Sequence, residues 1–563
     1  MEYISLLFPP EKSVQNDKSS FDIDEQIIRD LELDKIFREI APSDRIYLEL
    51  MPFLNKISSD KDIINYRLDV FEDLYTNENL FDVFSRLLLD IDTLSVKRSI
   101  TADNGIMLYN IASRLGELQS YINCIDSLDR AFQEKKTKIR SSAFTKLKEL
   151  VARAKSDDLF PILKENLPEI FKRFRGIKSL SVGINVDKNM IPYEATLLSV
   201  NTEKYTGKSA GVLKNLFREK LSDNEGIAQL HFVPKKTIIV NGAQAVIDPE
   251  IGGHAVDPVL VPLFRDINEV LKKTLSPVYK SLKKYNSVNI TFLANLGSEI
   301  RFFLNSVSMI KKLEKAGLPV CRPVITDPEN RILEAEESYN INLSLNLINN
   351  VNDKKIADNI IRNRIVLNDS GRIIILTGPN RGGKTTWLQA AGHLQIMAQI
   401  GLFTAAEKVL ISPVKSFFTH FPIEEKIEKG TGRLGDEAQR FSEIFSSVNK
   451  YSMCLFNESL SSTNATESYY IARDIIKVLM ITGTKTIFAT HLHELAAAVD
   501  DMNNEEGVKE KAVSMVSRVI EKKDGIERTF KIEPGPPIGQ SYAREIARKY
   551  GISYEQLIRN LNE

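Results

Sequence analysis

The chain has 563 residues, which is too long for a single hydrophobic core and indicates about three to four domains. Hydrophobic residues make up 43% and charged residues 27%, as in ordinary globular proteins, and no apolar run approaches the roughly 18–20 residues that a membrane span needs. Lysine plus arginine equals aspartate plus glutamate at 75 each, so any binding of nucleic acid must depend on local basic patches.

The N-terminus and the cysteines indicate where the protein works. Residues 1–5 lack a basic start followed by an apolar core, so no secretory signal is expected and the protein is expected in the cytoplasm. Cys124, Cys321 and Cys454 lie far apart and show no CxxC spacing. This spacing argues against a disulfide framework or a structural zinc site, and the three are expected to be buried as small apolar residues.

The first part of the chain shows helical periodicity. Residues 1–20 mix Pro, Lys, Ser and Asn without periodicity and are expected to form a flexible N-terminus. Apolar residues then recur at helical spacing and predict a helical block over residues 21–175. Within it, Pro52, Gly105 and Pro161 are the expected breaks.

A change of pattern predicts a small β-containing insert at residues 176–255, where short β-rich runs alternate with Gly-rich punctuation. Helical periodicity returns over residues 256–339. There, Pro277 is expected to kink the first helix, and a second helix carries apolar residues from Ile300 to Leu313 and ends at Gly317. Two helical blocks around an insert favour antiparallel, lever-like helices with the insert at their far end. An unrelated helical domain is the alternative.

From about residue 340 to residue 563, short apolar runs alternate with helical patterns, as in a parallel α/β sheet. The whole chain is therefore expected to be an α plus α/β multidomain protein.

The run 372–377 is a buried-strand pattern that leads directly into a glycine-rich loop and then a helix. This order is the context that a phosphate-binding Walker A loop requires. Its expected nucleotide-binding residues are Gly378, Pro379, Asn380, Arg381, Gly382, Gly383, Lys384, Thr385 and Thr386.

Each polar group of this loop has an expected role. The glycines let backbone N–H groups surround an anion, and Lys384 supplies a charge for the β and γ phosphates. The hydroxyl of Thr385 is placed to bind Mg²⁺.

The apolar strand 453–456 ends in Asn457 and Glu458, where Glu458 is expected to orient or deprotonate the hydrolytic water. Asn457 replaces the usual metal-binding Asp, which predicts weaker Mg²⁺ retention or slow turnover. A plain strand exit is the alternative interpretation.

A third apolar strand, 486–490, places His491 at its end. In a parallel sheet this position lies near the γ-phosphate, so His491 is predicted to act as a γ-phosphate sensor, although a lone histidine is more often structural. His493 has weaker support, and Glu494 is expected to begin the next helix.

Together these residues resemble the MutS family of ABC-superfamily ATPases. The resemblance is specific over residues 340–563, whereas residues 21–339 are similar to the family's core, lever and clamp regions only in pattern and order. Four segments carry the resemblance: 377–386, 409–419, 489–495 and the closing stretch 534–543.

The resemblance implies a homodimer with composite ATP sites, each nucleotide lying between the Walker A loop of one subunit and a trans segment of the other. The trans segment is expected at Gly432–Glu437, with Ser461–Asn464 meeting the partner. The sequence departs from the family here, because it lacks the usual trans serine and the Gly-Thr after the Walker B acid. An ordinary surface turn is the alternative for Gly432–Glu437.

Two family features are expected to be missing. Phe37-Arg38-Glu39 spells the mismatch-wedge motif, but it lies in a helical pattern with too few residues before it for the domain that carries this motif. It is interpreted as accidental. The chain also stops soon after the closing signature, so no terminal nuclease-like domain is expected.

The sequence thus predicts an ATPase, using ATP and Mg²⁺, that acts as a clamp on DNA, most plausibly mismatched or structured DNA. Alternatives are an RNA- or ribosome-acting switch, or a regulatory ATP-binding scaffold with weak hydrolysis. Phosphate contacts or plain solvated faces remain alternatives for the basic clusters Lys135–Arg140, Lys172–Arg175, Lys272–Lys273 and Lys283–Lys284.

Overall fold

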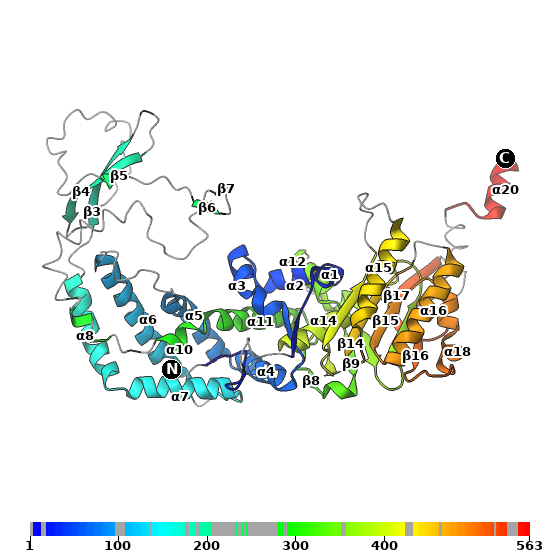
Figure 1. Ribbon diagram of the computed structural model, residues 1–563, viewed down its shortest axis with the longest axis horizontal. Coiled ribbons are helices and arrows are strands. Elements are labelled where there is room, and N and C mark those ends of the chain that lie inside the picture. The colour runs from blue at the N-terminus through cyan, green and yellow to red at the C-terminus, as the bar shows by residue number, and fades with distance from the viewer. Residues whose placement is uncertain are drawn as a thin grey trace. The chain divides into compact units, whose positions relative to one another are not determined.

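The structure is a computed structural model of the chain (Figure 1). It describes residues 4–12, 19–95, 107–134, 137–174, 179–186, 188, 192–201, 203, 231–232, 238–240, 243–245, 278, 280–282, 284–285, 288, 290–350, 356–422, 432–460, 464–522, 525–537 and 550–562. None of the described helices is long and apolar enough to cross a membrane.

The chain divides into two compact units, and each is treated by itself. The first contains Asn79–Lys138 and Thr145–Ile300 together with Met1–Ile4. The second contains Ser5–Glu78, Ile139–Phe144 and Arg301–Glu563. The N-terminal helices up to residue 78 are therefore in the same unit as the Walker A loop.

The first unit consists of long helices followed by antiparallel strands. Its helices are α5 (Glu78–Ser95), α6 (Met107–Gln133), α7 (Ser142–Ser156), α8 (Leu159–Phe174) and α10 (Thr291–Ala294). A three-stranded antiparallel sheet has the order β3-β4-β5, and β6 pairs with β7. All of these strands lie within residues 176–255: β3 (Ser179–Val186), β4 (Pro192–Asn201), β5 (His231–Phe232), β6 (Ile238–Val240) and β7 (Ala243–Ala245).

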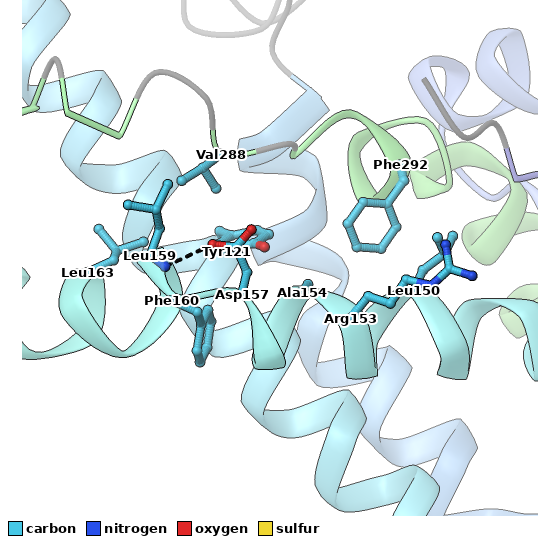
Figure 2. Close-up of a pocket in the computed structure, with 10 residues that line it drawn as sticks. All are labelled: Tyr121, Leu150, Arg153, Ala154, Asp157, Leu159, Phe160, Leu163, Val288 and Phe292. Atoms are coloured by element: carbon cyan, nitrogen blue, oxygen red, sulfur yellow. Dashed lines mark hydrogen bonds between the residues drawn. The ribbon is translucent and has the colours of Figure 1, made fainter.

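A pocket of about 300 Å³ lies between the helices of the first unit (Figure 2). Tyr121 of α6 meets Phe160 of α8 edge-on across it, with ring centroids 6.1 Å apart. The amide of Leu159, the first residue of α8, donates to Asp157 Oδ1 at 2.8 Å. The lining residues are Tyr121, Leu150, Arg153, Ala154, Asp157, Leu159, Phe160, Leu163, Val288 and Phe292.

A six-stranded sheet forms the centre of the second unit, in the order β13-β14-β15-β11-β16-β17. The first five strands are parallel, as the sequence predicts, whereas β17 returns antiparallel to β16. This differs from a purely parallel sheet because β16 and β17 are joined by a short connection, which only an antiparallel pair allows. The strands are β11 (Ile373–Thr377), β13 (Ser416–His420), β14 (Ser452–Asn457), β15 (Lys485–Ala489), β16 (Ala512–Lys522) and β17 (Gly525–Pro534).

Helices cover this sheet on both faces (Figure 1). Cys454 and Phe456 of β14 lie in one hydrophobic core with α15 and α16. Leu455 points the other way, toward Gly392 of α14. Because neighbouring residues of a strand face opposite sides, β14 is buried along its whole length. The helices of this region are α14 (Lys384–Ile400), α15 (Gly432–Ser447), α16 (Ala465–Thr482), α17 (His493–Ala497), α18 (Val499–Asn503) and α20 (Tyr554–Asn562).

A second, four-stranded sheet of the same unit has the order β10-β9-β12-β8. It draws strands from both sides of residue 340, the expected start of the ATPase region. Its strands are β8 (Val324–Ile325), β9 (Leu333–Ser338), β10 (Asn363–Leu367) and β12 (Lys408–Ile411). The helices around it are α12 (Ile341–Asn350), α13 (Ile356–Asn359) and the 3-10 helix η3 (Pro328–Asn330).

The N-terminal segment packs on α14, a contact that the sequence does not predict. Gln389 donates to the carbonyl of Asp30 at 3.0 Å, and His393 Nε2 donates to the carbonyl of Leu31 at 2.7 Å. Leu6 and Leu7 are buried, although residues 1–20 are expected to be flexible. Apolar side chains of this segment therefore belong to the core. The elements are β1 (Ser20–Asp22), α1 (Glu25–Asp30), α2 (Leu33–Ile40), α3 (Asp44–Leu54), β2 (Lys56–Ser58) and α4 (Lys61–Thr76).

Helix ends lie within two residues of two of the expected breaks, although both prolines are themselves helical. Pro52 lies inside α3, which ends two residues later at Leu54, and Pro161 is the third residue of α8. A proline in the first turn of a helix removes only an N–H group that has no intrahelical partner, so α8 tolerates it. Gly105 and Pro277 lie outside the described residues.

The predicted helix from Ile300 to Leu313 is confirmed. Helix α11 spans Gly297–Lys315, and Gly317 just beyond it has φ +82°, the left-handed conformation that glycine adopts most easily. The three cysteines are free, as predicted. Cys124 and Cys454 are buried, whereas Cys321 is only partly buried.

Candidate nucleotide site

The glycine-rich loop joins β11 to α14, as the sequence predicts. Gly378 has φ +140° and Gly383 has φ +91°, so the loop uses conformations that side chains with a Cβ adopt poorly. A Cβ on Gly378 would also lie 2.7 Å from the Cβ of Ser517. The loop is therefore closely packed against β16 while it presents its backbone at the start of α14.

Lys384 is the first residue of α14, and its ammonium turns back over the loop. Nζ donates to the carbonyls of Gly378 at 3.0 Å and Pro379 at 3.2 Å, and lies 3.8 Å from Glu458 Oε1. The side chain is buried. Burial lowers the pKa of Lys384, and the Glu458 carboxylate opposes that shift.

The next residue, Thr385, contacts the end of β14. Its hydroxyl donates to Asn457 Oδ1 at 3.2 Å. The described residues contain no group of three or more His, Cys, Asp or Glu side chains that would hold a metal ion by themselves. The Thr385 hydroxyl and the Asn457 amide oxygen instead form a neutral pair of oxygen atoms beside the loop, which suits Mg²⁺ with its water and phosphate ligands.

Glu458 and His491 meet at the ends of neighbouring strands. β15 lies between β14 and β11, so it brings His491 between the Walker A loop and Glu458. His491 Nε2 donates to Glu458 Oε1 at 2.8 Å. This hydrogen bond holds the pKa of Glu458 below its ordinary value, against the opposing effect of partial burial. The carboxylate is therefore ionised at neutral pH and faces both His491 and Lys384.

His493 begins α17 two residues later. Burial lowers its pKa, and the nearby His491 and Lys384 lower it further. Its Nδ1 atom is buried and has no hydrogen-bond partner among the described residues. Glu494 lies in the first turn of α17, as the sequence predicts.

Several residues that the sequence does not single out support the loop. Asn340 Nδ2 donates to the carbonyl of Thr386 at 3.1 Å, and Ser517 Oγ donates to the carbonyl of Gly382 at 2.6 Å. The ring of Phe530 lies where a Cβ on Gly383 would touch it, at 3.4 Å. These residues come from distant strands and loops, so no local sequence signal marks them.

The expected trans segment Gly432–Glu437 is the first part of helix α15. The surface-turn alternative is therefore wrong. Glu437 is buried, and its Oε2 accepts a hydrogen bond from the amide of Leu460 at 2.8 Å. Ser461–Thr463 lie outside the described residues, and Asn464 caps α16 by accepting from the Glu467 amide.

Other sequence features have structural roles or lie outside the described residues. Phe37 is buried in α2 and Glu39 pairs with Lys312, which supports the interpretation of the wedge-like motif as accidental. Arg140 pairs with Glu72. Parts of the basic clusters and of the closing stretch lie outside the described residues: Lys135–Lys136, Arg175, Lys272–Lys273, Lys283 and 538–543.

The parallel strand order, the loop between β11 and α14, and the polar residues at the ends of β14 and β15 define a P-loop α/β fold. Two family models match the chain. MutS domain V matches residues 374–561, and the MutS2 N-terminal domain matches residues 59–316. The chain belongs to the MutS family.

Curated relatives show the same similarity. Endonuclease MutS2 from Thermus thermophilus is 29% identical over 35% of this chain and 25% of its own length. DNA mismatch repair protein MutS from Caldicellulosiruptor saccharolyticus is 24% identical over 88% of this chain and 55% of its own length. Endonuclease MutS2 from Caldanaerobacter subterraneus is 26% identical over 70% and 49%. The chain thus spans about a quarter to about half the length of these relatives.

Proposed function

We propose that the protein is an ATPase that works as a dimeric, nucleotide-driven clamp on DNA. One observation carries the ATPase part of the proposal: Lys384, Glu458 and His491, from three separate elements, converge at the Walker A loop. Membership of the MutS family and the names of the relatives, which include DNA mismatch repair protein, support the DNA part.

In this proposal, the loop residues 378–386 bind the phosphates of ATP and the Lys384 ammonium moves from the loop carbonyls to the γ-phosphate. Glu458 orients the attacking water and takes up its proton, and His491 positions Glu458 and contacts the γ-phosphate. Mg²⁺, held beside Thr385 and Asn457, would neutralise phosphate charge. The products are ADP and phosphate.

The dimer would form composite sites, with the start of α15 from one subunit facing the nucleotide of the other. We further propose the domain order of a helical lever in two parts, 21–175 and 256–339, a clamp-like insert at 176–255 and an ATPase domain at 340–563. ATP binding would close the paired levers around duplex DNA of mismatched or branched structure, and hydrolysis would open them.

Gel shifts on mismatched, branched and linear DNA, each with ATP, ADP or no nucleotide, test the nucleic-acid part. We expect ATP-dependent retention of a mismatched or branched duplex by wild-type protein, and none by Lys384→Ala. Ribosome co-sedimentation is run in parallel. Retention of ribosomes without any DNA shift would contradict the DNA clamp and favour the RNA-acting alternative.

Asn457 favours one second function, a regulatory ATP-binding scaffold with weak hydrolysis. A neutral amide holds the water shell of Mg²⁺ less strongly than a carboxylate does. Under this alternative, wild-type protein binds ATP normally and releases phosphate near background, while Asn457→Asp releases it faster. Isothermal titration and a phosphate-release assay measure both properties. Equal rates for wild type and Asn457→Asp would exclude Asn457 as the cause of slow turnover.

A further inference from the structure

The short loop after β14 has an uncommon backbone conformation. Glu458 has φ +48° and Leu460 has φ +64°, so two non-glycine residues within three positions are left-handed. Such residues are strained and persist only where surrounding contacts hold them. The direction of the Glu458 side chain therefore depends on what holds Ser459 and Leu460.

Contacts from three elements hold this loop. Glu437 Oε2 of α15 accepts from the Leu460 amide at 2.8 Å, and Ser468 Oγ of α16 donates to the Leu460 carbonyl at 2.6 Å. His420, at the end of β13, contacts the hydroxyl of Ser459 through Nδ1 at 2.8 Å. Both polar backbone atoms of Leu460 are thus satisfied by side chains.

The contact between Glu437 and the Leu460 amide comes from the first turns of helix α15. Glu437 lies five residues after Gly432, the start of α15, within the segment expected to face the partner subunit. One helical turn later, Phe441 stacks on His420 with ring centroids 4.8 Å apart and meets Phe456 of β14 edge-on. The first turns of α15 are therefore tied both to the strand and to the loop that carry Glu458.

We propose that Glu437 is a positioning residue for hydrolysis: it couples the start of α15 to the orientation of Glu458. This inference rests on the proposed ATPase function. When a partner contacts the start of α15, any displacement of Glu437 moves the Leu460 amide and with it the backbone that directs Glu458. The carboxylate of Glu437 acts through the loop and does not touch the nucleotide.

Three variants of the full-length chain test the proposal. Glu437→Ala removes the acceptor for the Leu460 amide. Glu437→Gln keeps an acceptor oxygen of similar reach and serves as the conservative rescue. Glu443→Ala is the matched control, because Glu443 lies on the same helix, pairs with Arg440 and is half exposed.

We expect Glu437→Ala to lower kcat for ATP by roughly 10- to 100-fold, the effect of misplacing a catalytic group by about 1 Å. KM for ATP should change little, because the phosphate-binding loop is untouched. Glu437→Gln and Glu443→Ala should stay close to wild type in both constants. Hydrogen exchange of the Leu460 amide should rise in Glu437→Ala alone.

The outcomes separate this inference from the proposed function. Wild-type kcat in Glu437→Ala overturns the coupling while the ATPase function stands, and this holds even if amide exchange rises, since the contact is then only structural. A matching loss of kcat in Glu443→Ala also overturns it. No ATP turnover by the wild type refutes the ATPase function, and the inference falls with it.

Discussion

At the scale of single residues, the Glu458 carboxylate lies close to two other polar groups of the candidate site. It accepts a hydrogen bond from His491 and lies 3.8 Å from the buried Lys384 ammonium. A base for hydrolysis must be ionised and aimed at the water. The hydrogen bond from His491 lowers the pKa of Glu458, which meets the first requirement, and in the proposed mechanism the left-handed loop would meet the second.

This arrangement predicts a pH effect. A carboxyl with a depressed pKa stays ionised until the pH falls below its ordinary range, so wild-type kcat should persist to low pH. Removing the hydrogen bond in His491→Ala lets the Glu458 pKa rise, and the acid limb of the kcat profile should move to higher pH. Steady-state kcat measured between about pH 3.5 and 8 tests this, because that window extends below the ordinary carboxyl pKa.

His493→Ala is the control for this profile, because the hydrogen bond that lowers the pKa of Glu458 comes from His491. Its acid limb should coincide with that of the wild type. An unchanged acid limb in His491→Ala would show that the hydrogen bond does not set the ionisation of Glu458.

Helix α14 is the element on which the site depends. It begins at Lys384 and ends at Ile400, and Gly401, which caps it, has φ +88°. A Cβ at Gly401 would lie 2.2 Å from the Cβ of Arg67 in α4. The C-terminal end of the helix is thus closely packed against the N-terminal segment of the chain.

Gly401→Ala should therefore destabilise the second unit by roughly 2–4 kcal/mol, from the left-handed conformation together with overpacking. Gly507→Ala is a matched comparison, because Gly507 has φ +84° but no heavy atom within 4 Å of an added Cβ. It should cost only about 1–2 kcal/mol. Urea denaturation measures both, and equal losses would contradict the close packing against Arg67.

Some features of this helix can be predicted from the sequence, and others cannot. The strand–loop–helix order around Lys384 is local, so residue types and spacing predict it. The proximity of Glu458 and His491 is also predictable, because parallel strands end at one edge of a sheet. The contacts of α14 with Leu31 and Asp30 join positions more than 300 residues apart, and no periodicity predicts such pairs.

At the scale of the whole molecule, neither compact unit is a single continuous stretch of the chain. The N-terminal helices up to residue 78 belong with the P-loop sheet, although their sequence pattern is continuous with the helices of the first unit. Amphipathic periodicity shows that a helix has a buried face, but not what covers it. Ser517 and Phe530 line the loop from β16 and β17, and no local sequence signal marks them because they lie more than 100 residues after it.

ATP turnover is the central claim for the molecule, and steady-state phosphate release tests it most directly. We predict release by the wild type, no nucleotide binding by Lys384→Ala, and ATP binding with release reduced by roughly 10²- to 10⁴-fold in Glu458→Ala, the usual contribution of a general base. Size-exclusion chromatography of Glu458→Ala with ATP should show a trapped dimer. Phosphate release at the wild-type rate by both variants would contradict the account.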